Sequence, residues 1–320
     1  MASRLTDPQA LLRLRTRQLL LVAQLGRERH LGRAAAALGV SQPAATKLLQ
    51  QLEAALEARL FTRGPRGMAP TDSGEALIRF AAQMLTDFGV TRETMRSLDA
   101  GLQGRLRLGS VPGAMPNLVA PALAGFRRTH PGVSVHLDVA TSDLMLERLA
   151  LGEVDLVLGR LTDRSDADAF DATPLLAEPQ VVVVRGGHPL TRRGARVDLA
   201  ALARLAWVLQ PPGSPQRTRF EDALREAGLQ TRLDIMETAS TVATTALLEQ
   251  SDMATVMPAS LARHYGRLGV LAVLRFELPM KVPAVHLIRR RARWLSPAAE
   301  AFAQAVQAQA ASGASRSAAR

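Results

Sequence analysis

The stretch RAAAALGVSQPAATKLLQQLE, residues 33–53, joins two pieces rich in alanine and leucine through a short break. Gly39 interrupts the first helical pattern. Ser41 can cap the helix that follows, and Pro43 falls in its first turn, where a missing N–H costs nothing. A helix, a short turn with glycine and a second helix form the helix-turn-helix pattern. We expect the alanines at 34–37 to let the first helix pack closely on its neighbours.

A second break lies near residues 63–67, and a long helix is expected from Thr71 to about Leu98. One stripe of this helix is apolar except at Thr91, and its steps alternate between four and three residues. Two helices packing along each other need such a seam, although a helix lying on its own domain's core gives the same pattern. Gly101 and Gly104 then end the helix. The candidate dimerisation residues are Leu77, Ala81, Met84, Phe88, Met95 and Leu98.

The net charge of +11 is concentrated at the two ends of the chain. Residues 1–66 contain 11 Lys and Arg against 4 Asp and Glu, and residues 281–320 contain 7 against 1, which leaves 22 against 24 between them. Basic ends on a nearly neutral body suggest a polyanion-binding end attached to a body with another task. A solvated basic surface is the alternative on charge alone.

The chain has no cysteine, so neither disulfides nor thiolate metal sites hold its fold. Its longest early apolar run, residues 19–25, is too short to cross a bilayer and is not followed by a signal-peptide cleavage site. We therefore expect a cytoplasmic, nucleoid-associated protein without a membrane partner. We also expect neither a metal nor a cofactor.

After Gly104 strands and helices alternate, which predicts parallel sheets covered by helices on both faces. Two such sets follow each other. If the chain crosses between them near residues 174–180 and again near residues 277–283, the last strand and helix belong to the first lobe. Two lobes with two crossovers make a hinge and a cleft at the carboxyl ends of the strands. The run at 181–184 is expected to be core.

Residues 33–75, RAAAALGVSQPAATKLLQQLEAALEARLFTRGPRGMAPTDSGE, resemble the winged helix-turn-helix of LysR-type transcriptional regulators. The family pattern AA-x-x-L-x-V-S-Q-P-A, then L-E, L-F-x-R and T-x-x-G, is present in order. The resemblance implies an α/β protein with an all-α N-terminus: a winged helix-turn-helix, a long linker helix and two Rossmann-like periplasmic-binding-protein (type 2) lobes. The expected domains are 1–70 for DNA binding, 71–103 for the linker, 104–310 for effector binding and 311–320 as a disordered tail. Lobe I comprises 104–177 and 281–310, and lobe II comprises 178–280.

The sequence departs from the family pattern at three places. His30 stands where the family often has a serine ahead of the second helix, so the cap of that helix is weaker. Pro70 replaces the leucine before the threonine of the wing. In the second lobe, residues 250–253 replace a Gly-x-Gly turn, and Asp252 is expected to tolerate the left-handed conformation there.

In helix-turn-helix proteins the first turn of the second helix faces the major groove of DNA. Gln42 can offer its amide to adenine, while Pro43 and Ala44 present apolar surface to a thymine methyl group. Polar and basic neighbours are better placed for phosphates, and the arginines of the wing can reach the backbone or the minor groove. For Ser41 a capping role, and for Lys47 a solvated charge, are the alternatives. The candidate DNA contacts are Arg33, Ser41, Gln42, Pro43, Ala44, Thr46, Lys47, Arg63 and Arg66.

Small anions bind where strands end and helices begin, because free N–H groups and the helix dipole point at them. Hydroxyl and amide side chains occupy several such points of the body. Ser142 and Ser240 are alternatively plain helix caps, and Arg160 alternatively pairs with an acid such as Asp163. His188 is interpreted as a turn residue. The candidate effector-binding residues are Ser110, Val111, Thr141, Ser142, Arg160, Gln210, Ser214, Ser240 and Thr241.

The resemblance implies a regulator that binds promoter DNA as a homodimer or homotetramer and responds to an effector, with RNA polymerase as a candidate partner. Some features resemble the branch linked to sugar-binding proteins and aromatic-acid catabolism, so a small organic acid or a sugar-derived compound is expected. The sequence contains no Gly-x-Ser-x-Gly or phosphate-loop signature, so we do not expect an enzyme. A ligand-independent architectural DNA-binding protein is the main alternative. The least expected reading is an enzyme with a DNA-binding appendage.

Overall fold

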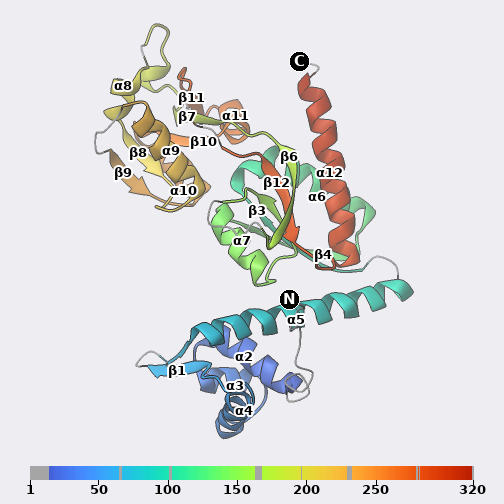
Figure 1. The fold of residues 1–320 in the computed structure, drawn as a ribbon. Coiled ribbons are helices and arrows are strands. Elements are labelled where there is room, and N and C mark those ends of the chain that lie inside the picture. The colour runs from blue at the N-terminus through green and yellow to red at the C-terminus, as the bar shows by residue number, and fades with distance from the viewer. Residues whose placement is uncertain are drawn as a thin grey trace, which may run out of the picture. The chain divides into compact units, whose positions relative to one another are not determined.

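The fold is that of a computed structural model (Figure 1), which describes residues 14–64, 67–100, 103–162, 168–195, 197–228, 233–278, 280 and 282–318. Side chains at 93, 94, 96–100 and 314–318 are outside this description. The chain divides into two compact units, Met1–Arg92 and Glu93–Arg320. Each unit is described by itself.

The first unit is a helical domain with a two-stranded wing. Its core contains side chains from the first three helices and the wing, and Leu21, Val22 and Leu52 are completely buried. This arrangement is the winged helix-turn-helix expected from the sequence. Its elements are α2 (Thr16–Glu28), α3 (Leu31–Ala37), α4 (Gln42–Ala55), β1 (Phe61–Gly64), β2 (Gly67–Pro70) and α5 (Asp72–Ala100).

The turn between α3 and α4 follows from local chemistry. Gly39 has a φ of 65°, a left-handed conformation that suits glycine, and it ends α3. Ser41 caps α4, since its Oγ accepts a hydrogen bond from the N–H of Ala44 at 3.4 Å. His30, the departure from the family pattern, caps α3 through Nδ1, which accepts from the N–H of Arg33 at 3.4 Å. Within the alanine run only Ala34 and Ala35 are buried, so close packing involves two of the four alanines.

The wing is anchored on the turn between α2 and α3. The N–H of Met68 donates to the carbonyl oxygen of Arg29 at 2.8 Å. Gly67 lies so close that a Cβ there would come within 2.3 Å of the same oxygen, and its φ is 119°. Glycine is therefore required at this position, because a side chain would push the wing away from α3.

The expected seam of α5 divides into two parts. Ala81 is completely buried, and Leu77 and Met84 pack against the core of the first unit. Phe88 and Met95, further along, are 67% and 64% exposed. The side chain of Leu98 lies outside the described residues. The first part of the stripe therefore packs into the core of its own domain, whereas Phe88 and Met95 do not.

The second unit begins with lobe I, a five-stranded sheet in the order β4-β3-β5-β12-β6. β3 is parallel to β4 and β5, whereas β12 is antiparallel to β5 and β6. Helices α6 and α12 cover one face and α7 the other (Figure 1). The elements are β3 (Gly104–Ser110), η1 (Pro112–Ala114), η2 (Met115–Val119), α6 (Ala120–Thr129), β4 (Val133–Val139), α7 (Ser142–Ala150), β5 (Leu156–Gly159), β6 (Phe170–Leu176), β12 (Val285–Arg290) and α12 (Pro297–Ala318).

Lobe II contains a three-stranded sheet in the order β10-β7-β11 and a parallel pair β8-β9, joined by a bridge between Trp207 and Ala254. Trp207 and Phe220 pack against each other in its core, with ring centroids 4.8 Å apart and ring planes tilted by 49°. The elements are β7 (Gln180–Arg185), η3 (Pro189–Thr191), α8 (Leu199–Ala203), β8 (Ala206–Leu209), α9 (Pro215–Glu226), β9 (Asp234–Glu237), α10 (Thr241–Glu249), β10 (Thr255–Pro258), α11 (Ala259–Arg267) and β11 (Leu271–Val273).

Three details differ from expectation. The sheets are mixed, because strands next to the crossovers (β6, β7 and β12) pair antiparallel with their neighbours. Residues 311–318 continue α12 instead of forming a disordered tail, in keeping with the high helix propensity of alanine, while 319–320 lie outside the description. Asp252 is not left-handed, since the described non-glycine residues with positive φ are Arg29, Glu57 and Ala292.

Within the described ranges, no helix is both long and apolar enough to span a membrane.

Candidate functional site

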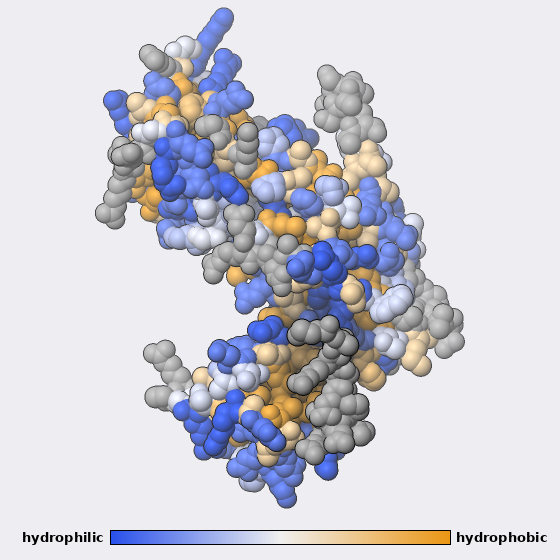
Figure 2. Space-filling model, in the orientation of Figure 1, coloured by the Kyte–Doolittle hydropathy of each residue, from blue (hydrophilic) through white to orange (hydrophobic). Residues whose placement is uncertain are grey.

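The first turn of α4 projects from the first unit as an exposed polar edge. Ala45, Leu49 and Leu52 lie on the buried face of the helix, so the opposite face, including Gln42 and Lys47, is exposed. Pro43 and Ala44 are exposed too. In Figure 2 the lower end of this unit, where α4 lies, is mostly hydrophilic. The helix therefore presents the first-turn side chains that sequence analysis assigned to DNA.

The hydroxyls beside this edge have structural partners. Ser41 acts as the cap of α4, and the Thr46 Oγ1 donates to the carbonyl oxygen of Gln42 at 3.0 Å. The Gln42 Oε1 lies over the start of α3, 3.3 Å from where a Cβ of Gly32 would be. Both hydroxyl oxygens retain acceptor capacity, so a capping role leaves room for a contact with DNA.

The basic candidates differ in how they are held. The Arg33 Nε donates to the Glu28 carboxylate at 3.0 Å, and its Nη2 to the Glu28 carbonyl oxygen at 2.6 Å. Lys47 makes no ion pair with any described residue. Arg63 is exposed on β1, and Arg66 lies outside the described residues. Arg33 is thus fixed on its own domain, whereas Lys47 and Arg63 present their charge to solvent.

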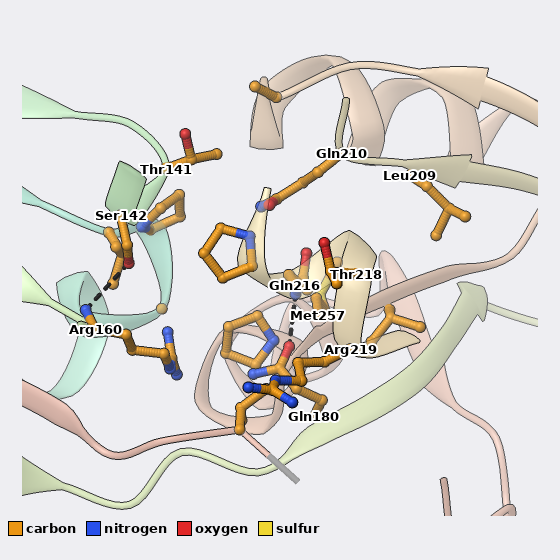
Figure 3. A pocket seen from close by; sticks show the side chains of 18 of the residues that line it. Thr141, Ser142, Arg160, Gln180, Leu209, Gln210, Gln216, Thr218, Arg219 and Met257 are labelled. Carbon is orange, nitrogen blue, oxygen red and sulfur yellow. Dashed lines mark hydrogen bonds between the residues drawn. The ribbon is translucent and has the colours of Figure 1, made fainter. Parts of the chain in front are cut away.

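A pocket of about 250 Å³ lies between the two lobes of the second unit. Lobe I contributes η1, the start of α7 and the loop after β5, and lobe II contributes the starts of α9, α10 and α11 (Figure 3). Several helix N-termini therefore border one cavity, where their N–H groups and dipoles favour an anion.

Arg160 is the charged group of lobe I in this pocket, and it is only 9% exposed. Its N–H donates to Ser142 Oγ at 3.1 Å, and its Nε donates to the carbonyl oxygen of Pro283 at 2.9 Å. Its Nη2 is buried without a hydrogen-bond partner among the described residues. Burial lowers the pKa of this guanidinium below its ordinary value, although the nearby Glu178 opposes the shift. Because Arg160 lines the pocket, an anion there would interact favourably with its guanidinium.

The pocket brings together some of the residues expected at the effector site and leaves others out. Ser110 is completely buried, and its hydroxyl donates to the Val111 carbonyl oxygen. Ser214 and Ser240 cap α9 and α10 through the N–H groups of Arg217 and Ala243. Ser142 is not a cap but the acceptor for the Arg160 N–H. The expected residues that line the pocket are Val111, Thr141, Ser142, Arg160, Gln210 and Thr241.

One wall of the pocket, made by α9 and the first crossover, was not expected from the sequence. Gln216 donates from its Nε2 to the Oε1 of Gln180 at 2.6 Å, which ties α9 to the start of β7. Thr218 and Arg219 line the pocket from the same helix (Figure 3). Ser214 as cap and Pro215 in the first turn mark the start of this helix in the sequence, but no local pattern indicates which of its side chains face the pocket.

The lobes also touch directly beside the pocket. The Ser260 Oγ donates to the carbonyl oxygen of Gly113 at 3.1 Å, and the Ser260 N–H donates to the buried Glu178 carboxylate at 2.8 Å. A Cβ on Gly113 would lie 2.5 Å from Cγ of Pro258. Because Gly113 belongs to lobe I and Pro258 to lobe II, this contact fixes the spacing of the lobes at one edge of the pocket.

Two family models match this chain. "Bacterial regulatory helix-turn-helix protein, lysR family" matches residues 16–75, and "LysR substrate binding domain" matches residues 99–311. The chain belongs to the LysR family. This LysR-type protein is therefore a DNA-binding transcriptional regulator with an effector-binding domain, and its families and relatives are regulators, not enzymes.

Relatives agree with this assignment, and solved structures share the fold. The regulator is 36% identical to the HTH-type transcriptional regulator GbpR of Azospirillum brasilense, over 92% of this chain and 86% of that protein. It is 33% identical to an SDS degradation transcriptional activation protein of a Pseudomonas species, over 89% and 93% of the two chains. A full-length OxyR from Pseudomonas aeruginosa has the same fold, with a TM-score of 0.66 at 23% identity, over 93% of this chain and 94% of that chain. CbnR in complex with its target DNA also has this fold, with a TM-score of 0.63 at 23% identity, over 92% of this chain and 100% of that chain.

Proposed function

We propose that this LysR-type regulator binds a promoter through the first turn of α4 and that a small effector in the pocket between the lobes modulates this binding. The effector is a small organic acid or a sugar-derived compound. The regulator acts on the nucleoid in the cytoplasm as a homodimer or homotetramer, with RNA polymerase as a further partner.

The observation that carries the proposal is the state of Arg160. Its guanidinium is 9% exposed, and one nitrogen has no hydrogen-bond partner among the described residues, so an anion beside it would stabilise the charged form. It lies in a pocket whose walls come from both lobes, so a ligand there contacts both lobes at once. A ligand that binds one arrangement of the lobes better than another shifts the population toward that arrangement. This shift would change the affinity of the DNA-binding unit for the promoter.

The test is a thermal-shift screen of the full-length protein against small organic acids and sugars, followed by DNA-binding titrations with each hit. We expect at least one acid to raise the melting temperature and to change the affinity for a target promoter. Arg160→Gln should abolish the shift. Arg225→Gln is the matched control, because Arg225 lies on α9 in an exposed ion pair with Asp222 and does not line the pocket.

A ligand-independent architectural DNA-binding protein makes the opposite prediction. In that case no compound would change melting or the DNA footprint, and Arg160→Gln would leave DNA binding by the full chain unchanged in every condition.

A further inference from the structure

Arg29, between α2 and α3, has a backbone conformation that favours glycine over arginine. Its φ and ψ are 51° and 19°, in the left-handed region, where a Cβ is close to the following carbonyl oxygen. This conformation ends α2, since the N–H of Arg29 donates to the carbonyl oxygen of Leu25 at 2.9 Å. A residue that keeps such a conformation is a candidate for a functional role, because its surroundings must maintain it.

The carbonyl oxygen of Arg29 is bonded to the wing. It accepts the hydrogen bond from the N–H of Met68, at 2.8 Å, and the absence of a side chain on Gly67 lets the strand come this close. Met68 is the register partner of Arg63, the exposed arginine on the other strand of the wing. A two-stranded ribbon is only marginally stable by itself, so the position of Arg63 depends on where the wing is attached.

The two strands of the wing are attached to different helices of the domain. At the start of β1, the Glu53 carboxylate of α4 accepts from the N–H groups of Leu60 and Phe61 at 2.8 and 3.3 Å. On β2, the bond from Met68 to Arg29 fixes the strand to the end of α2. The orientation of the wing relative to α4 therefore depends on both attachments.

The side chain of Arg29 contacts the first turn of α5. Its Nη2 donates to the Glu75 carboxylate at 3.2 Å. The two side chains are 46% and 42% exposed, so this ion pair contributes little by itself. The start of α5 has further bonds to the segment before β1, because Thr71 donates from its N–H to Leu60 and from its Oγ1 to Arg59. The carbonyl group of Arg29, rather than its charge, is therefore the part that locates the wing.

We propose that Arg29 is a positioning residue for DNA binding. Its left-handed backbone holds the wing, and with it Arg63, where α4 and the wing contact the same duplex. Arg29 acts through the wing, and its own guanidinium pairs with Glu75 instead of a phosphate. This inference rests on the proposed binding of DNA through α4 and on the expected contact of Arg63 with the DNA backbone.

Two variants separate the backbone of Arg29 from its side chain. Arg29→Gly and Arg29→Val both remove the guanidinium, but glycine adopts the left-handed conformation readily, whereas β-branched valine does not. The probe is a duplex that the wild-type protein selects from a random-sequence pool. Anisotropy titrations of the full-length proteins over a range of salt concentrations give the slope of log affinity against log salt. One phosphate contact contributes about one to the magnitude of this slope.

Arg63→Ala should lower the magnitude of the slope by about one in the wild type. Arg29→Val should lower it by about the same amount, and Arg63→Ala should then change it no further. Arg29→Gly should keep the wild-type slope and remain sensitive to Arg63→Ala. Circular dichroism and melting curves establish that each variant is folded.

Gly67→Ala disturbs the same contact without changing any charge. Its Cβ would lie 2.3 Å from the carbonyl oxygen of Arg29, so the variant should have the slope of Arg29→Val and the same insensitivity to Arg63→Ala. This pair of variants gives the same test if Arg29→Val does not fold. Gly64→Ala is the matched control in the wing, since its Cβ would meet nothing closer than 3.9 Å, and it should keep the wild-type slope.

The inference is overturned if Arg63→Ala leaves the wild-type slope unchanged, or if Arg29→Val and Gly67→Ala keep that slope. It is also overturned if Arg63→Ala has its full effect in those backgrounds, or if Arg29→Gly lowers the slope as much as Arg29→Val. The last result would assign the guanidinium to a phosphate. In all these cases the proposed binding through α4 stands, and it fails only if Gln42→Ala and Lys47→Ala leave the affinity unchanged.

Discussion

At the scale of single residues, variants of Gln42 and Lys47 are predicted to separate two components of DNA binding. Both are exposed on α4, but an amide can read a base edge, whereas an ammonium group at this position is suited to phosphates. We expect Gln42→Ala to cost about 1–3 kcal/mol on the matched site and to relax base preference. Lys47→Ala should weaken matched and scrambled sites alike and flatten the salt dependence. Anisotropy titrations on both sites measure the difference, and equal losses for Gln42→Ala would remove the base-reading role.

His188 predicts a pH dependence of stability. It is 3% exposed, and its Nδ1 accepts from the N–H of Leu190 at 3.1 Å. Burial lowers its pKa below 6.5; Asp252 raises it and Arg185 lowers it, both more weakly than burial. As the pH falls below about 6.5, His188 is protonated in the unfolded chain before it is protonated in the folded protein. The free energy of unfolding therefore decreases as the pH falls from about 6.5 to the lower pKa of the folded state.

His188→Asn keeps an acceptor for Leu190 and removes the titration. The drop in melting temperature between about pH 7.5 and pH 5.5 should therefore be smaller in the variant than in the wild type. An equal drop in both proteins would show that His188 does not supply this dependence.

At the scale of elements, the exposed end of the α5 stripe predicts where two chains meet. Phe88 is 67% exposed, whereas Ala81 of the same stripe is buried in its own domain. A large aromatic residue at the centre of an interface is typically among its strongest contributors. Phe88→Ser should weaken self-association at least about tenfold, measured by sedimentation velocity. Leu268→Ser, at a 64% exposed leucine outside α5, is the matched control. Unchanged sedimentation of Phe88→Ser would assign assembly to another surface.

The elements also show what sequence predicts well. The start of α4 could be predicted because its cap, Ser41, and its first-turn proline lie within three residues of each other. The antiparallel pairing of β12 with β5 could not, because it joins His286 to Gly159 across more than a hundred residues. Strand direction there depends on how the chain returns from lobe II, and local periodicity carries no information on that path.

At the scale of the whole effector-binding unit, the pocket also contains some residues that the sequence predicts and others that it does not. Residues at helix starts, such as Thr141 and Thr241, were predictable because a hydroxyl next to a strand end is a local pattern. Arg219 was not, because it lies inside α9 and reaches the pocket only through the packing of the two lobes. Gln180 is a similar case, since its role depends on its pairing with Gln216. Part of the candidate site can thus be predicted from local sequence motifs, and the other part is formed only by the tertiary structure.

The contact between Gly113 and Pro258 tests whether the pocket depends on the spacing of the lobes. In Gly113→Ala the new Cβ would lie 2.5 Å from a rigid proline ring, so one lobe must move and the Ser260 hydrogen bond to Gly113 is strained. We expect the free energy of unfolding to fall by about 1–3 kcal/mol, measured in urea by the fluorescence of the buried Trp207.

The same variant should bind any organic acid that raises the melting temperature of the wild type at least about tenfold more weakly, because moving one lobe changes the pocket that both lobes line. Gly125→Ala is the matched control. Its Cβ meets nothing closer than 3.9 Å, and alanine favours α6, so stability should be equal or higher and binding unchanged. If Gly113→Ala lost stability while keeping full affinity, the pocket would not depend on lobe spacing, and effector binding could not be transmitted through the angle between the lobes.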